Sequence, residues 1–210
     1  AALGPDRHRN AEVLELFLDV FESVPLFRSA PNIDRIVRAV LDIGLSLPYS
    51  PNVDKAMLYC LCSLVWRGRI AEVKPLWIRI FFKTKARHTP EMKQFHRAFL
   101  GALFYLEGKI ARAARIFDSL GGDTEKLPSD FILLEYFLLV AHCYALSGRI
   151  SRAVSLIDSI RTHAHMNRRR DVEAWALGTL GVILIESGWY EEAGNILSEI
   201  EQIENWDAHF

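Results

Sequence analysis

The residue types that could do chemistry are sparse in this chain, and their spacings limit what they could do. Cys60 and Cys62 lie two residues apart, as do His163 and His165, and Cys143 stands alone. On a helix such neighbours point about 200° apart, so neither pair can share a metal ion as an i, i+4 pair could. We therefore expect no metal site and no cofactor, and we interpret the cysteines as small apolar side chains.

The arrangements that catalysis requires are also missing from the sequence. It contains no HExxH motif, no phosphate-cradling glycine loop, no nucleophile elbow and no zinc-spaced set of cysteines and histidines. The Gly121–Gly122 pair is typical of a turn. We predict that the protein is not an enzyme.

Composition indicates a folded chain without a strong electrostatic field. Of the 210 residues 50% are hydrophobic and 24% are charged, and the formal net charge is -1. Such a balance disfavours general attraction to nucleic acid or to an anionic membrane. The most apolar run, residues 131–146, carries Glu135 and His142 and is shorter than the roughly 20 residues of a membrane span, so it predicts a buried helix.

The ends of the chain and its cysteines indicate its setting. The first residue is alanine and no secretory signal follows it, so we expect a piece of a larger protein. Three cysteines without paired spacing fit reduced thiols. The expected compartment is the cytoplasm.

The clearest signal in the sequence is a phrase repeated around a glycine. It occurs at Gly68, Gly108, Gly148 and Gly188, so that successive copies lie 40 residues apart. In every copy Ile or Tyr follows the glycine by two positions, and Val or Ala follows it by five. This fixed order indicates one structural unit repeated four times.

Apolar residues on both sides of each glycine keep helical spacing. In the third copy, Val140 and Tyr144 precede Gly148, and Ile150 and Ala153 follow it. This spacing predicts a first helix that ends at the glycine and a second helix that begins just after it. Glycine can adopt the left-handed conformation that terminates a helix, and the small residue lets the two helices pack closely.

The fourth copy carries the features of a known repeat family. Leu180 and Gly181 form a leucine–glycine pair, Gly188 marks the turn, Tyr190 is the aromatic and Ala193 is the small residue. This segment resembles a tetratricopeptide repeat, and with the other copies in register the resemblance covers about residues 52–204. The family period is about 34 residues. The longer period here resembles the sensor segment of ATP-dependent bacterial transcription activators of the maltotriose-regulator kind.

The resemblance implies an all-α fold, a right-handed superhelical solenoid of about five antiparallel helix hairpins. We expect a single helical-repeat domain over residues 1–210, with an irregular hairpin over 1–50 and repeats over 51–88, 89–128, 129–168 and 169–207. Asn32 and Asn52, each preceded by proline, are the predicted helix starts. The expected helices cover residues 9–24, 32–46, 52–67, 70–84, 90–107, 110–120, 129–147, 150–164, 169–187 and 190–204. Long connections are expected near residues 29–31, 84–90 and 121–129.

A solenoid of this kind lines an inner groove with the first helix of every hairpin. The family register implies that groove positions lie 13, 10, 6, 3 and 2 residues before each turn glycine, and most of them here are apolar or aromatic. The residues that we expect to contact a ligand or partner are Lys55, Trp66, Tyr105, Glu135, His142, Trp175 and Glu186. The alternative is that these side chains pack against one another and fill the groove.

We predict a non-catalytic binding or sensing scaffold within a bacterial transcriptional or signalling regulator. Its partner would be a protein, a neighbouring domain or a small effector held in the groove. A structural spacer or a module that forms homo-oligomers is the alternative. Direct nucleic-acid binding is disfavoured, because the basic residues between Arg67 and Arg87 and around Arg168–Arg170 are more typical of solvated helix faces.

Overall fold

The computed structural model describes residues 5–23, 32–120, 131–201 and 203, and every regular element in these residues is a helix. The α-helices are α1 (Pro5–Ser23), α2 (Ile33–Ser46), α3 (Pro51–Trp66), α4 (Ile70–Thr84), α5 (Pro90–Leu106), α6 (Ile110–Asp118), α7 (Phe131–Leu146), α8 (Ile150–Met166), α9 (Arg170–Glu186) and α10 (Tyr190–Glu201), and a short 3-10 helix, η2 (Lys85–Arg87), follows α4. The chain forms two compact units, unit 1 over residues 1–96 and unit 2 over residues 97–210. The all-α prediction is confirmed.

The four repeated glycines form the corners of helix hairpins, as predicted. Their φ angles are +72° at Gly68, +73° at Gly108, +77° at Gly148 and +80° at Gly188, all in the left-handed region. At each corner the next residue donates its N–H to a carbonyl five positions earlier, as Arg149 does to Tyr144 at 2.9 Å. These bonds satisfy carbonyls at the end of the first helix. The second helix then begins two residues after each glycine.

The small residue of each repeat is buried where the two helices of a hairpin meet. Val73, Ala113, Ala153 and Ala193 are all at most 3% exposed. In the second repeat the approach is closest at Gly101 of α5, where an added Cβ would overlap the Phe117 ring on α6. Gly101, which follows Leu100 as Gly181 follows Leu180, therefore makes room for an aromatic ring.

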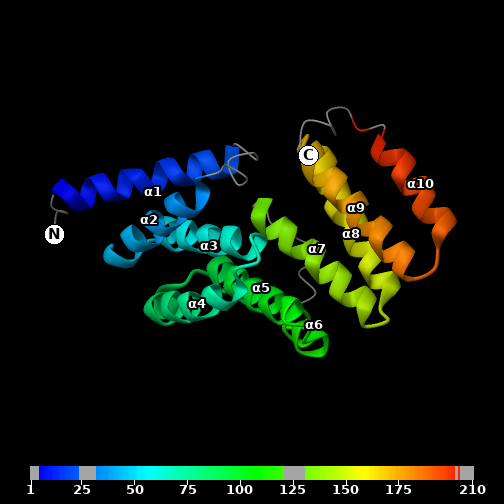
Figure 1. The fold of residues 1–210 in the computed structure, drawn as a ribbon, viewed down its shortest axis with the longest axis horizontal. Coiled ribbons are helices and arrows are strands. Elements are labelled where there is room, and N and C mark those ends of the chain that lie inside the picture. The colour runs from blue at the N-terminus through cyan, green and yellow to red at the C-terminus, as the bar shows by residue number, and fades with distance from the viewer. Residues whose placement is uncertain (1–4, 24–31, 121–130, 202, 204–210) are drawn as a thin grey trace. The chain divides into compact units, whose positions relative to one another are not determined.

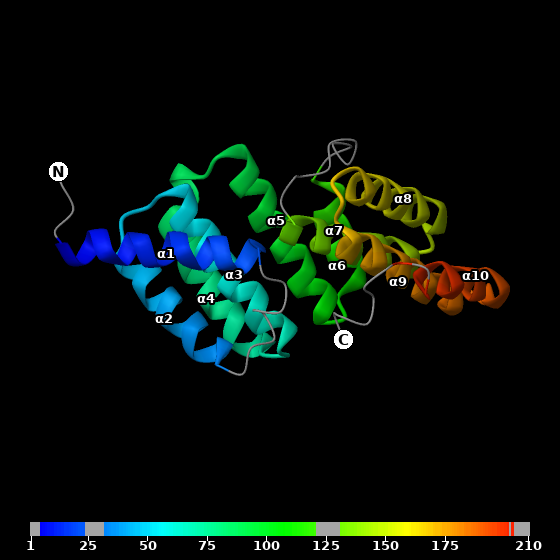
Figure 2. The same cartoon turned by 90° about the horizontal axis from the view of Figure 1, so that it is seen from above.

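Unit 1 contains α1 and α2, the hairpin of α3 and α4, and the first residues of α5. Helix α1 packs across α2 and α3 (Figure 2) and buries Leu14, Phe17 and Leu18 against them. Lys83 of α4 donates to the carbonyls of Leu45 at 2.6 Å and Leu47 at 3.1 Å. This ammonium group therefore caps the C-terminal end of α2.

The helix starts differ slightly from the predicted ones. The predicted start at Asn52 is wrong, because α3 begins at Pro51 and the Ser50 hydroxyl oxygen caps it by accepting the Val53 N–H at 3.2 Å. Asn32 precedes α2, but its side chain makes no capping hydrogen bond. The predicted connections at residues 29–31 and 121–129 lie outside the described residues, and the one at 84–90 contains η2.

Unit 2 contains the last three glycine corners. Helices α7, α8, α9 and α10 pack in succession, and α7 also packs against α9, so first helices stack on first helices (Figure 1). Phe99 of α5 meets Tyr136 of α7 edge-on at a centroid distance of 5.8 Å. Among the residues that the structure describes, none of the helices has the length and apolarity that a bilayer span requires.

Candidate functional site

Three of the residues predicted to face the groove are joined in unit 2. The hydroxyl of Tyr105 on α5 lies 2.6 Å from Nδ1 of His142 on α7. Nε2 of His142 lies 2.7 Å from Oε2 of Glu186 on α9. A Tyr105–His142–Glu186 chain therefore crosses three consecutive first helices of the repeats.

The partners of His142 define which atoms donate and which accept in this hydrogen-bond chain. The Glu186 carboxylate can only accept, so we assign the His142 proton to Nε2, and Nδ1 then accepts the Tyr105 hydroxyl. Burial raises the pKa of Tyr105, and the Glu186 and Cys143 charges raise it further. The phenol is therefore kept protonated as a hydrogen-bond donor, which is the opposite of what a nucleophile needs.

Helix α9 presents an exposed apolar stripe next to the Tyr105–His142–Glu186 hydrogen-bond chain. Trp175 is 37% exposed, Val182 46% and Ile185 49%. The spacings of seven and three residues place them on one face of the helix, and Glu186 adjoins its C-terminal end. Leu146, at the α7 position that matches Glu186, is 48% exposed. We call this surface the first-helix face of unit 2, and its members are the half-buried Tyr105 and His142 and the exposed Leu106, Leu146, Trp175, Val182, Ile185 and Glu186.

The remaining expected positions are deeper in the fold or lie outside the described side chains. Ala98, Ala102 and Leu138 are at most 6% exposed, so part of the expected lining belongs to the core. Lys55 of unit 1 is half-buried, with Nζ 5.3 Å from the centre of the Tyr59 ring. The side chains of Trp66 and Glu135 lie outside the described part of the structure.

A second cluster of titratable groups lies in unit 1, and the sequence did not predict it. Asp54 in the first turn of α3 is buried, and its Oδ2 lies 3.1 Å from Nε2 of His88 and 3.2 Å from Nε2 of His96. Thr84 Oγ1 lies 2.5 Å from the same His88 nitrogen and donates to the Ile80 carbonyl at 2.9 Å. The ligating atoms of Asp54, His88 and His96 all lie within 4.8 Å of one another, as in a metal centre.

The arrangement of the imidazoles fits hydrogen bonding better than metal ligation. The indole N–H of Trp77 donates to Nδ1 of His96 at 3.2 Å, so the His96 proton lies on Nε2 and points at Asp54. The His88 and His96 rings are stacked at 4.3 Å with 14° between their planes. A metal binds in the plane of an imidazole at about 2.0–2.1 Å, and two nearly parallel rings cannot direct both lone pairs at one ion. We therefore assign the cluster as a buried carboxylate that accepts the His96 Nε2–H, with His88 beside it and hydrogen-bonded to Thr84.

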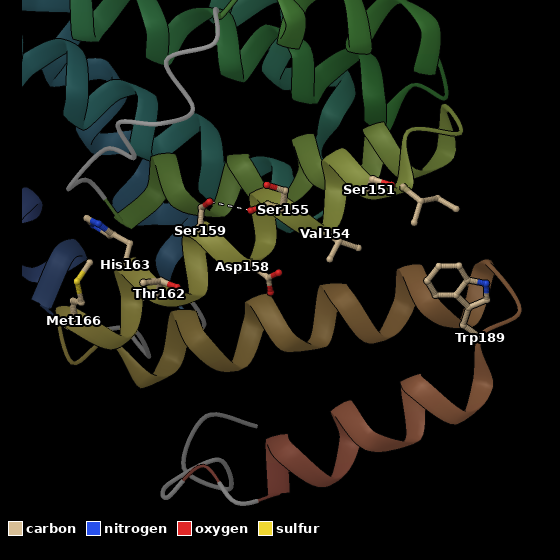
Figure 3. A pocket seen from close by; sticks show the side chains of 10 residues that line it. Ser151, Val154, Ser155, Asp158, Ser159, Thr162, His163, Met166 and Trp189 are labelled. Atoms are coloured by element: carbon tan, nitrogen blue, oxygen red, sulfur yellow. Dashed lines mark hydrogen bonds between the residues drawn. The ribbon is translucent and has the colours of Figure 1, made fainter.

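A cavity of about 790 Å³ runs along one face of α8 (Figure 3). Its lining is largely a row of small polar side chains with Asp158, and Trp189 at the α9–α10 corner lies at one end. One of these hydroxyls, Ser159 Oγ, donates to the Ser155 carbonyl of its own helix at 2.9 Å. None of the residues predicted to bind a partner lines this cavity.

Comparison with known proteins supports the repeat fold. One solved structure, a variant of a kinesin light chain-like protein of Podosopora anserina with nearly identical TPR-like repeats, is 13% identical, with a TM-score of 0.61 over 97% of this chain and 98% of that one. A second structure from the same organism, with the same kind of repeats, is 14% identical, with a TM-score of 0.59 over 94% of this chain and 96% of that one. No family model and no curated protein matches the sequence. The chain therefore has a TPR-like helical-repeat fold.

Proposed function

We propose that this chain is a non-catalytic scaffold that binds a protein segment on the first-helix face of unit 2. The observation that carries the proposal is the exposed stripe of Trp175, Val182 and Ile185, which ends beside the carboxylate of Glu186. Exposed apolar side chains gathered on one face and bordered by a fixed polar group are typical of interaction sites. The hydrogen-bond chain through His142 holds that polar group in place.

We extend the proposal to the setting of the protein. The 40-residue repeat period, which resembles that of bacterial transcription-activator sensors, supports a role in a transcriptional or signalling regulator. Cys60, Cys62 and Cys143 are buried free thiols, which supports a cytoplasmic location. Occupancy of the first-helix face would then bias the domains attached to this segment.

Selection of peptides from a displayed library on the full chain tests the binding role. We expect the selected peptides to lose about 30-fold in affinity when Trp175→Ala removes the largest side chain of the stripe, because buried aromatic anchors contribute about 2 kcal/mol at interfaces. Leu16→Ala is the matched control, because Leu16 of α1 is 64% exposed but lies in unit 1. Peptides that bind the Trp175→Ala variant as tightly as the unchanged chain would contradict the proposal.

A further inference from the structure

We propose that the first-helix face of unit 2 takes a basic amphipathic helix, with an apolar side on the α9 stripe and lysine or arginine residues directed at Glu186. This inference rests on the proposed function and specifies the chemistry of the partner. The charge of the surface, its hydrogen-bonding capacity and the spacing of the stripe each support it.

The charge of this part of the chain is strongly one-sided. Residues 171–210 contain nine acidic residues and no lysine or arginine, although the whole chain has a net charge of only -1. Several of these acids have partners within unit 2: Asp171 pairs with Arg169 at 3.0 Å, and Glu199 pairs with Arg161. Glu186 instead accepts from the His142 imidazole, and among the described residues it forms no ion pair with a lysine or arginine.

The first-helix face lacks a basic side chain of its own. Its charged residue is Glu186, and its other members are apolar or aromatic apart from His142. Lys109 follows the Gly108 corner, three residues after Leu106 of this face, and its ammonium group pairs with Glu107 at 2.6 Å. A carboxylate accepts about four hydrogen bonds, and His142 supplies one of them, so Glu186 has acceptor capacity for a cationic side chain.

The spacing of the stripe suits a helix. From Trp175 to Ile185 the stripe spans ten residues of α9, about 15 Å at 1.5 Å per residue. A partner helix presents apolar side chains at i, i+3, i+4 and i+7 over the same length and can match it. An extended segment cannot bind here by adding a strand to a sheet, because the described residues contain no strand. The helical form is therefore favoured.

Two synthetic helices of opposite charge provide the test. Both carry the same leucine pattern over about 18 residues, and their polar positions are all lysine in one and all glutamate in the other. Each is labelled with a fluorophore and titrated with the full chain by fluorescence anisotropy at about 50 mM and about 300 mM NaCl. We expect the lysine helix to bind at least tenfold more tightly than the glutamate helix.

Variants locate the binding site. Glu186→Gln, which retains an acceptor for His142, should remove most of the preference for lysine, whereas Glu191→Gln on the exposed first turn of α10 should leave it nearly unchanged. Ile185→Ala should weaken both helices. Equal effects of the two charge variants would overturn the assignment of the contact to Glu186.

The remaining outcomes separate the two proposals. Binding of the glutamate helix as tightly as the lysine helix, lost in Ile185→Ala, would overturn the partner chemistry and leave the binding role intact. If neither helix binds, and no peptide from the displayed library depends on Trp175, both proposals fail. Circular dichroism of each variant confirms that the helical fold is retained.

Discussion

Two histidine networks in this chain show how the same side chain serves different ends. His142 lies at the surface of unit 2 and transmits a hydrogen bond from Tyr105 to Glu186. His88 and His96 are buried in unit 1 beside the single carboxylate of Asp54, to which His96 donates while His88 hydrogen-bonds to Thr84. The first network orients a group that a partner can reach, and the second stabilises the junction of α3, α4 and α5.

The buried network makes the stability of the fold sensitive to acid. Burial lowers the pKa of His88, the neighbouring His96 lowers it further, and the Asp54 carboxylate opposes them. Because the unfolded chain then takes up a proton at a higher pH than the folded chain does, the contribution of His88 to stability is lost as the pH falls below about 6.5. We predict that urea denaturation shows a falling free energy of unfolding between pH 7 and pH 5, by at most about 1.4 kcal/mol per pH unit from this group.

His88→Gln tests that attribution, since glutamine keeps an N–H donor but does not titrate in this range. The variant should be less stable at neutral pH by about 1–3 kcal/mol, because the amide fits the site imperfectly. Its pH profile should be flatter than that of the unchanged chain. Parallel profiles would show that the acid sensitivity arises elsewhere.

At the scale of the helices, the corners between the repeats are built alike but from different residues. Four corners use glycine at positive φ, and the α8–α9 corner uses Arg168 at φ 55°. Its hydrogen bonds follow the same pattern, with the Arg169 N–H donating to the Ala164 carbonyl at 2.9 Å. Non-glycine residues are strained in this conformation.

Arg168→Gly should therefore stabilise unit 2 by about 0.5–1 kcal/mol, because glycine relieves that strain but adds freedom to the unfolded chain. Chemical denaturation measures the change. The neighbouring Asn167→Gly is the control, since Asn167 has an ordinary φ of -95° and its side-chain amide donates to the His163 carbonyl at 2.8 Å. A loss of stability in Arg168→Gly would contradict the strain argument.

The hairpins could be predicted from the sequence because their determinants are local. A glycine, a large apolar residue and a small one in fixed order define each corner, and α4, α6, α8 and α10 begin at the predicted residues. The α8–α9 corner has no glycine, and it is the positive φ of Arg168 and the hydrogen bonding in the structure that reveal it as the same turn. The Asp54 cluster could not be predicted, since its members come from separate elements 34 and 42 residues apart in sequence. Its one signal was polar residues at positions where helical register points into the core.

For the molecule as a whole, the repeat places first helices side by side in unit 2, so residues about 40 positions apart share one surface. The chain Tyr105–His142–Glu186 is the direct result, because each member comes from a different repeat. A single hairpin could not build this surface. The binding role that we propose is therefore a property of stacked repeats and not of any one of them.

Methyl NMR of the full chain, titrated with the lysine-bearing helix, tests the central claim most directly. We predict that the largest shift changes fall on the methyl groups of Val182, Ile185 and Leu146, while Leu16 on α1 and Ile78 on α4, which are also exposed, stay unchanged. Shift changes centred instead on Leu197 of α10, or spread evenly over the exposed methyl groups, would contradict a binding site on the first-helix face.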